Sequence, residues 1–198
     1  KRVAVYVSPA AERAIRQGHP WVYGSAITQQ KGNGRSGDIA VLFTRKNTFL
    51  AVGLYDPHSP IRVRVLHQGS PAVIDGAWWQ AQLTKAALRR EPLVAEGTTG
   101  YRLVHGENDG FSGLIIDRYA GTLVLKLYTT AWLPHLRGIL HGLTSIIQPE
   151  RVVLRLNRSV AKHEDELFGL QNGDILLGEP LTGPVQFQEN GLWFAADV

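Results

Sequence analysis

The sequence predicts an α+β protein in two parts: a small, partly closed β-barrel over residues 1–67, and an α+β domain over residues 72–198 in which a sheet packs on a helix. Short β-prone runs separated by glycine-rich turns fill the first third of the chain. Two stripes of apolar residues at helical spacing occur in the remainder, among further β-prone runs. The two parts also differ in charge, which favours a division between them.

The composition is that of an ordinary globular protein. Of the 198 residues, 44% are hydrophobic and 19% are charged. The absence of cysteine excludes disulfides, thiolate metal sites and thiol nucleophiles from these residues. No apolar run approaches the roughly 18 residues that a membrane span needs, and no cationic leader with an apolar core opens the chain. We therefore expect no membrane partner and a cytoplasmic location.

Charge is distributed unevenly along the chain. Residues 1–66 hold ten Lys and Arg against three Asp and Glu, a balance of +7, whereas residues 67–198 hold 11 against 14, a balance of −3. The two balances sum to the +4 of the whole chain. A basic module of this kind is a candidate for binding a polyanion such as RNA. The alternative is a solvated basic face without a ligand, and charge alone does not separate the two.

The first part is predicted to be a series of strands with one short helix. Every second residue from Val3 to Val7 is a valine, a pattern typical of a strand. Ser8 and Pro9 then cap a helix over residues 10–17, which Gly18 ends. The remaining predicted strands are Ile39–Thr44, Phe49–Tyr55 and Ile61–Leu66.

Five residues of the first part are candidates for RNA contacts. Arg62 and Arg64 alternate with apolar residues, so both lie on one face of their strand, where they could bind phosphate or stack on a base. Lys46 adds a cation in a predicted turn, and His19 and Trp21 lie in the loop after the helix. Four of the five have a structural alternative: Trp21 packs in the core, His19 supports the loop, and the two arginines form a solvated strand face.

The polar segment 68–75 marks the predicted boundary between the two parts. A helix is predicted over Gly76–Glu91, ended by Pro92, with cations gathered near its C-terminal end, where they are favoured. This helix is interpreted as a packing or interdomain helix. A second helix is predicted over Ala131–Ile147, where apolar residues recur at steps of three and four, and Pro149 ends it.

The predicted strands of the second part surround the stretch His105–Tyr119. A long polar loop separates the first two strands of this region, and a tight turn separates the second from the third. Short strands also follow the second helix, the last two joined by a hairpin turn. The predicted strands are Tyr101–Val104, Leu114–Ile116, Thr122–Thr129, Arg151–Asn157, Ile175–Gly178, Val185–Gln188 and Leu192–Ala196.

The polar loop carries unusual turn chemistry. Three glycines punctuate it, Gly106, Gly110 and Gly113. We predict that at least one of them has a positive φ and that the acids of the loop bond backbone amides. A metal site formed by His105, Glu107 and Asp109 is a less favoured alternative, because those side chains would point the same way only if the segment were extended.

Three segments resemble one known family. Residues 102–121, RLVHGENDGFSGLIIDRYAG, are similar to the opening of the central domain of the bacterial S-adenosylmethionine-dependent 23S rRNA cytosine-5 methyltransferases. That family usually has proline where Ser112 stands. Residues 18–23, GHPWVY, within the strand pattern of Val3–Leu66, resemble the PUA domain at the front of the same family. Residues 188–194, QENGLWF, resemble its last strand before the catalytic domain.

The resemblance implies a PUA domain that binds ribosomal RNA and a central domain that holds the RNA against a Rossmann-like catalytic domain. These residues contain neither a glycine-rich cofactor turn nor a cysteine nucleophile, so we expect no cofactor, no catalysis and no metal here. S-adenosylmethionine would serve the full-length parent. The missing methionine and the sequence at the end suggest an excised piece of that parent, whose possible homodimerisation is left open. A free-standing RNA-binding adaptor is the rival interpretation, and an enzyme using the His105–Asp109 loop is the third.

Overall fold

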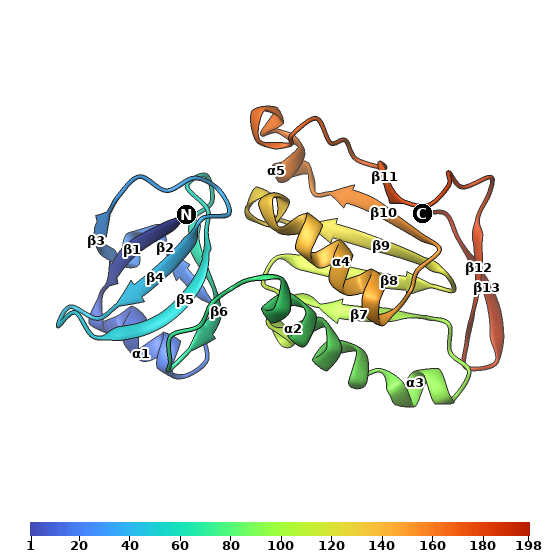
Figure 1. Cartoon of the computed structure of the whole chain (residues 1–198), viewed down its shortest axis with the longest axis horizontal. Helices are drawn as coiled ribbons and strands as arrows, with labels where there is room; N and C mark the ends of the chain where they lie inside the picture. Colours follow the sequence, from blue (N-terminus) through green and yellow to red (C-terminus); the bar gives the residue numbers. More distant parts are fainter. The chain divides into compact units, whose positions relative to one another are not determined.

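The computed structural model describes all 198 residues and divides them into two compact units (Figure 1). The first unit contains Lys1–Ile74 together with Thr129–His135. The second contains Asp75–Tyr128 and Leu136–Val198. The first unit is therefore made of two pieces of chain that are distant in sequence. No helix of the chain has the length and apolar character needed to cross a bilayer.

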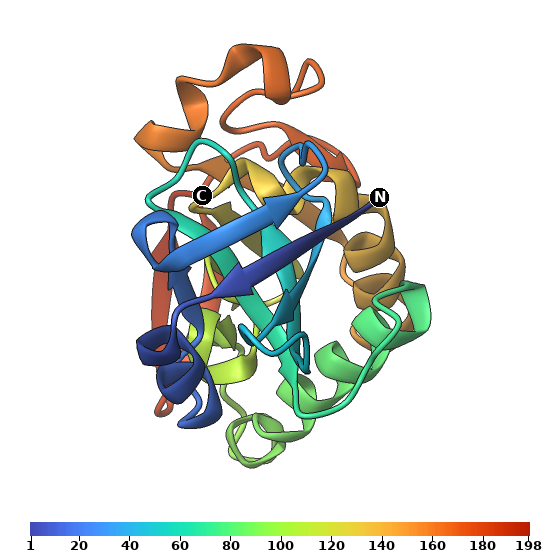
Figure 2. The same ribbon diagram turned by 90° about the vertical axis from the view of Figure 1, so that its left-hand side faces the viewer.

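The first unit is built on one curled six-stranded sheet in the order β2-β6-β5-β4-β1-β3 (Figure 2). Only β1 and β4 run parallel, and every other neighbouring pair is antiparallel. The 3₁₀ turn η1 (Gly24–Ala26) joins β2 to β3. The strands are β1 (Arg2–Val7), β2 (Trp21–Tyr23), β3 (Ile27–Lys31), β4 (Ile39–Phe43), β5 (Phe49–Tyr55) and β6 (Ile61–Gln68).

The core of the first unit lies on one face of this sheet. The valine alternation of β1 places Val3, Val5 and Val7 inward, each at most 1% exposed. Helix α1 (Pro9–Arg16) contributes Ile15 to the same core. Its N-cap residue Ser8 accepts a hydrogen bond from the Ala11 amide at 3.3 Å, which satisfies one of the free donors of the first turn. The sequence pattern therefore determined which face of β1 is buried.

The segment Thr129–His135 completes the first unit. The hydroxyls of Ser36 and Thr130 are hydrogen-bonded at 2.6 Å, and His135 Nε2 lies 2.8 Å from the carbonyl oxygen of Gly37. Gly37 has φ +82°, and a Cβ there would lie 2.7 Å from Pro134 Cγ, so the contact requires glycine. The backbone at Gly37 therefore packs directly against Pro134 and His135 of this segment.

This segment corrects one sequence prediction. The helix predicted from Ala131 begins instead as the 3₁₀ helix η3 (Thr130–His135), and α-helix α4 spans only Leu136–Ile146. Pro134 lies inside η3, where it lacks the N–H that an α-helical turn would use. The apolar periodicity predicted one α-helix over residues 131–147 because the apolar residues of η3 are buried, as those of α4 are.

The second unit is built on a five-stranded sheet in the order β11-β10-β9-β8-β7. Strands β9 and β10 are parallel, and the other pairs are antiparallel. Between β10 and β11 lie the short helix α5 (Arg158–Ala161) and the 3₁₀ turn η4 (Glu164–Glu166). The strands are β7 (Gly100–His105), β8 (Leu114–Tyr119), β9 (Thr122–Leu127), β10 (Arg151–Leu156) and β11 (Ile175–Leu177).

Two helices cover one face of this sheet, as Figure 1 shows. Helix α2 (Gly76–Leu88) packs against α4, where Gly142 faces Leu83 so closely that a Cβ would lie 2.8 Å from its Cδ1. The interpretation of α2 as a packing helix is thus confirmed. Its predicted end is wrong, because Pro92 lies in the first turn of a separate helix, α3 (Glu91–Ala95), where proline is tolerated.

A two-stranded hairpin, β12 (Val185–Glu189) and β13 (Leu192–Ala196), packs beside the start of β7. Phe187 lies over Gly100, where any Cβ would collide with its ring. The Phe187 ring also contacts Tyr119, with centroids 5.1 Å apart. The hairpin turn predicted at Glu189–Gly191 is confirmed, with positive φ at Asn190 and Gly191. Both units together confirm the predicted α+β class.

Candidate nucleic-acid interface

The loop between α1 and β2 brings two of the five predicted RNA-contacting residues together. Gly18, with φ +90°, ends α1 and turns the chain toward β2. The exposed His19 ring lies edge-on to the Trp21 ring, with centroids 5.9 Å apart. His19 Nδ1 lies 3.1 Å from the carbonyl oxygen and 3.2 Å from the amide nitrogen of Trp21, so the backbone of Trp21 holds the imidazole in place.

Strand β2 pairs with β6, which places Trp21 opposite Arg64 in the antiparallel register. Trp21 is only half-buried, so its indole is neither a full core residue nor a free surface ring. Arg62 is also half-buried: its guanidinium donates to the carbonyl oxygen of Pro57 and lies against Gly24, where a Cβ would be 3.4 Å from Arg62 Nη2. The guanidinium of Arg62 is therefore oriented by backbone groups and not by an acid.

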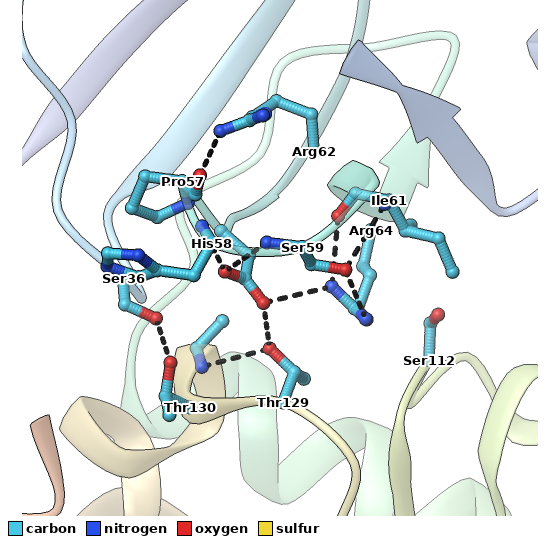
Figure 3. A network of polar contacts seen from close by, with 12 residues as sticks. Ser36, Pro57, His58, Ser59, Ile61, Arg62, Arg64, Ser112, Thr129 and Thr130 are labelled. Atoms are coloured by element: carbon cyan, nitrogen blue, oxygen red, sulfur yellow. Dashed lines mark hydrogen bonds and ion pairs between the residues drawn. The ribbon is translucent and has the colours of Figure 1, made fainter. Parts of the chain in front are cut away.

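Arg64 differs from the sequence expectation, because it is buried at 5% exposure. Its guanidinium lies 3.5 Å from Asp56 Oδ2 and donates to the Ile61 carbonyl oxygen at 3.1 Å and to Ser59 Oγ at 3.4 Å (Figure 3). An arginine held in this way is not exposed for a phosphate. The pairing of β2 with β6 shifts register at Arg62, and the turn after β5 supplies the groups that cover Arg64.

Asp56 is the centre of this polar network. Its Oδ1 accepts from the amides of His58 and Ser59, and its Oδ2 accepts from the hydroxyl of Thr129 at 2.5 Å. Thr129 belongs to the second piece of chain in the first unit. The network thus joins the β5–β6 turn to the Thr129–His135 segment, as Figure 3 shows. We therefore assign Arg64 a structural role.

Lys46 lies in the turn between β4 and β5, whereas the other four candidates lie on β2, on β6 or in the loop before β2. The turn is fixed by Thr44, whose hydroxyl oxygen accepts from the amides of Lys46 and Thr48, each at 3.2 Å. Asn47 follows with φ +61°, a conformation that asparagine tolerates. The Lys46 side chain is exposed and forms no ion pair. The structure thus leaves Lys46 accessible but separates it in the strand order from His19 and Trp21.

The polar loop of the second unit folds as the 3₁₀ turn η2 (Gly106–Asp109). All three of its glycines have positive φ, +51° at Gly106, +79° at Gly110 and +80° at Gly113. The prediction of left-handed backbone in this loop is therefore confirmed. Asp109 Oδ2 accepts from the His105 amide at 2.7 Å, which confirms the predicted bond from a loop acid to the main chain.

Asp109 also forms ion pairs that the sequence did not indicate. Arg90, the N-cap of α3, and Arg89, the C-cap of α2, lie 2.6 Å and 2.7 Å from the carboxylate oxygens. Burial alone would raise the pKa of Asp109, but the bonds from Arg90, the His105 amide and Arg89 bring that pKa below its ordinary value. The carboxylate is thus occupied by structural partners. No cluster of three or more metal-ligating acids, histidines or cysteines exists in the chain.

Comparison with known proteins finds a similarity in the first unit. Residues 5–68 match the family model described as a PUA-like domain. Curated relatives match nearly the whole chain. It is 50% identical over 202 residues to the "Ribosomal RNA large subunit methyltransferase" of Deinococcus radiodurans, an alignment covering 100% of this chain and 49% of that protein. It is 34% identical to the "Ribosomal RNA large subunit methyltransferase I" of Photobacterium profundum, an alignment covering 98% of this chain and 49% of that protein.

The chain is thus homologous to ribosomal RNA large subunit methyltransferases and spans about half the length of the curated relatives it matches. Solved structures share the fold. A Streptococcus mutans protein described as "a putative sam-dependent methyltransferase" superposes with a TM-score of 0.79 at 14% identity, covering 97% of this chain and 47% of that one. A structure described as "a putative methyltransferase complexed with SAH" gives a TM-score of 0.78 at 14% identity, covering 98% of this chain and 47% of that one. These likenesses confirm the fold class.

Proposed function

We propose that these 198 residues are the RNA-binding and substrate-positioning region of an S-adenosylmethionine-dependent methyltransferase that acts on 23S rRNA. The observation that carries this proposal is the end-to-end similarity to ribosomal RNA large subunit methyltransferases, of which the chain spans about half. The PUA-like first unit supports an RNA partner, because PUA domains bind RNA. Methyl transfer itself is assigned to parts of the longer protein outside these residues.

The charge of the first unit supports the same conclusion. Its three acids before residue 67 are all engaged: Glu12 pairs with Arg16, Asp56 pairs with Arg64, and Asp38 accepts a hydrogen bond from the Arg35 amide. Most of the ten cations of this region have no acidic partner, so their charge is available to phosphate. Neutralising phosphates releases condensed counterions, which drives binding at low salt.

The surface that we assign to this binding contains His19, Trp21 and Arg62, with Lys46 as a separate phosphate contact. His19 and Trp21 are in contact at the start of β2, and Arg62 lies on the neighbouring strand β6. An indole and an imidazole can stack on unpaired bases, and a guanidinium can donate two parallel hydrogen bonds to one phosphate. Arg64 is excluded from this surface because the Asp56 network holds it in the interior.

The second unit is proposed to hold the RNA against the catalytic domain of the longer protein. We assign cytosine C5 as the methylated position because residues 102–121 resemble that branch of methyltransferases. Adding to the base requires a nucleophile, cysteine in the families known to do this, and none is present among the 198 residues. S-adenosylmethionine would likewise be bound elsewhere, since no glycine-rich cofactor turn is present here.

The test uses the 198-residue chain with transcribed 23S rRNA in filter binding and with S-adenosylmethionine in calorimetry. We expect retention of the RNA and no heat of cofactor binding. Saturable binding of S-adenosylmethionine would contradict the proposal that the cofactor site lies outside these residues. Failure to retain the RNA would contradict the proposal that these residues bind RNA. The base assignment is tested separately on the longer protein, by mass spectrometry of nucleosides from methylated rRNA; a product other than 5-methylcytidine would refute it.

A further inference from the structure

A row of aromatic side chains crosses the outer face of the first unit's sheet. In β1 the valines point into the core, so Ala4 and Tyr6 point to the opposite face. Tyr6 is paired in register with Phe43 of β4, and Phe43 is paired with Phe49 of β5. Residues opposite one another on neighbouring strands project to the same side. The three rings therefore lie in line across three strands.

The rings contact one another and are each half-buried. The centroids of Tyr6 and Phe43 are 5.5 Å apart with the ring planes inclined by 28°, a stacked pair. Phe43 and Phe49 meet edge to face at 6.5 Å. The hydroxyl of Tyr6 donates to Asn47 Oδ1 at 3.0 Å, which fixes the Tyr6 ring beside the β4–β5 turn. The row is thus an ordered platform on the surface of the sheet.

Cations surround this platform. Lys31 of β3 is exposed, and its Nζ lies 5.2 Å from the centroid of the Tyr6 ring. Arg45 and Lys46 are exposed in the turn that carries Asn47. None of the three cations forms an ion pair, and the acids of residues 1–66 are engaged with other partners. The outer face therefore combines aromatic rings with positive charge that no acid of the chain neutralises.

We propose that this platform binds an unpaired stretch of RNA. Aromatic rings on a sheet stack with splayed-out bases, and flanking cations hold the phosphates between them. Lys31 covers the free face of the Tyr6 ring, so a phosphate that draws the flexible lysine aside exposes that face to a base. An aromatic row without cations would fit an apolar partner instead. Charge complementarity selects a single-stranded nucleic acid.

This inference rests on the proposed function and extends it to a second surface. Two features separate the platform from the surface at His19 and Trp21: the strands that carry it and its stacked rings. The sequence contained a signal for it, since Tyr6 alternates with the buried valines of β1. The partner strand could not be read from the sequence, because β1 pairs in parallel with β4, more than 30 residues away.

The test measures fluorescence anisotropy of a labelled single-stranded oligouridine with the 198-residue chain. Tyr6→Leu should weaken binding about tenfold, as expected for the loss of one stacked base, without changing the salt dependence. Tyr6→Phe keeps the ring while removing the bond to Asn47, so it should bind like the unmodified chain. Tyr128→Leu is the matched control, since Tyr128 is an exposed tyrosine of the second unit with Lys126 Nζ 5.4 Å from its ring centroid.

Lys31→Gln should lower the slope of log affinity against log salt by about 0.7, the value for one phosphate contact on a single strand. Arg13→Gln makes the same charge change on α1 and is the matched control. If Tyr6→Leu and Lys31→Gln bind as the controls do, the platform is refuted while rRNA binding by the chain still stands. If the unmodified chain binds neither oligouridine nor rRNA, both this inference and the proposed function fall.

Discussion

Arg64 and Arg62 are two residues apart on one strand, yet their environments differ completely. Both were expected on a solvated face, and Arg62 is indeed half-exposed. Arg64 is buried because it pairs with Asp56, which in turn accepts a hydrogen bond from Thr129. Thr129 is 73 residues from Asp56 in the sequence. Strand alternation predicts the side of a sheet that a residue occupies. Whether that side is covered depends on segments that a single sequence does not place.

The first residue-scale prediction concerns this pair. Arg64→Ala leaves Asp56 buried without its cation, and breaking a buried pair in this way costs about 3–5 kcal/mol. Urea unfolding should show this loss, while Arg62→Ala should cost far less because its side chain has no acidic partner. Wild-type stability in Arg64→Ala would show that the buried network contributes nothing.

A second residue-scale prediction concerns the loop glycines. Gly110 has φ +79° and open space where a Cβ would be, so Gly110→Ala isolates the backbone cost, about 1 kcal/mol. Gly76→Ala is the control, since Gly76 also has open space but lies in the first turn of α2 without a positive φ. Chemical denaturation should show destabilisation only for Gly110→Ala. Equal stability of the two variants would contradict this account of the loop.

At the scale of elements, the sequence predicted every strand near its observed position, apart from the edge strands β2 and β3. Apolar spacing and turn residues are local signals, and they identified α2, α4 and the His105–Tyr119 region. The errors occur where a proline changes the local helix: Pro92 begins α3 and Pro134 lies in η3. The aromatic platform was missed because it depends on strand order, which is set by tertiary contacts.

The η3 segment should make stability depend on pH. Burial lowers the pKa of His135 below its ordinary value of 6.5, against the opposing effect of the bond to the Gly37 carbonyl oxygen. Unfolding therefore takes up a proton in mild acid. Neutral His135 makes its full contribution to the free energy of unfolding above pH 6.5. This contribution is lost as the pH falls through the lower pKa of His135 in the folded state.

Urea unfolding at neutral pH and at about pH 5 measures this effect. The unmodified chain should lose stability in acid, and His135→Gln should lose less because its side chain does not titrate. His141→Gln is the control, since His141 is exposed on α4. Identical pH dependence in all three proteins would show that His135 does not contribute.

At the scale of the whole molecule, the two-unit division predicts where the chain can be cut. Residues 69–71 are exposed and lie outside any helix or strand, so limited proteolysis should cleave there first. Thr129–His135 belongs to the first unit, so we expect the two fragments to remain together on gel filtration. Their separation after a single cut would show that this segment does not hold the first unit together.

The central claim is that the basic first unit binds ribosomal RNA through its phosphates. The most direct test is the affinity of the 198-residue chain for transcribed 23S rRNA over a range of salt concentrations. We predict a steep linear fall of log affinity with log salt, and a slope smaller by about 0.7–0.9 for each of Arg62→Gln and Lys46→Gln. Binding that is absent, or that does not change with salt, would contradict the account and leave the first unit as a structural spacer.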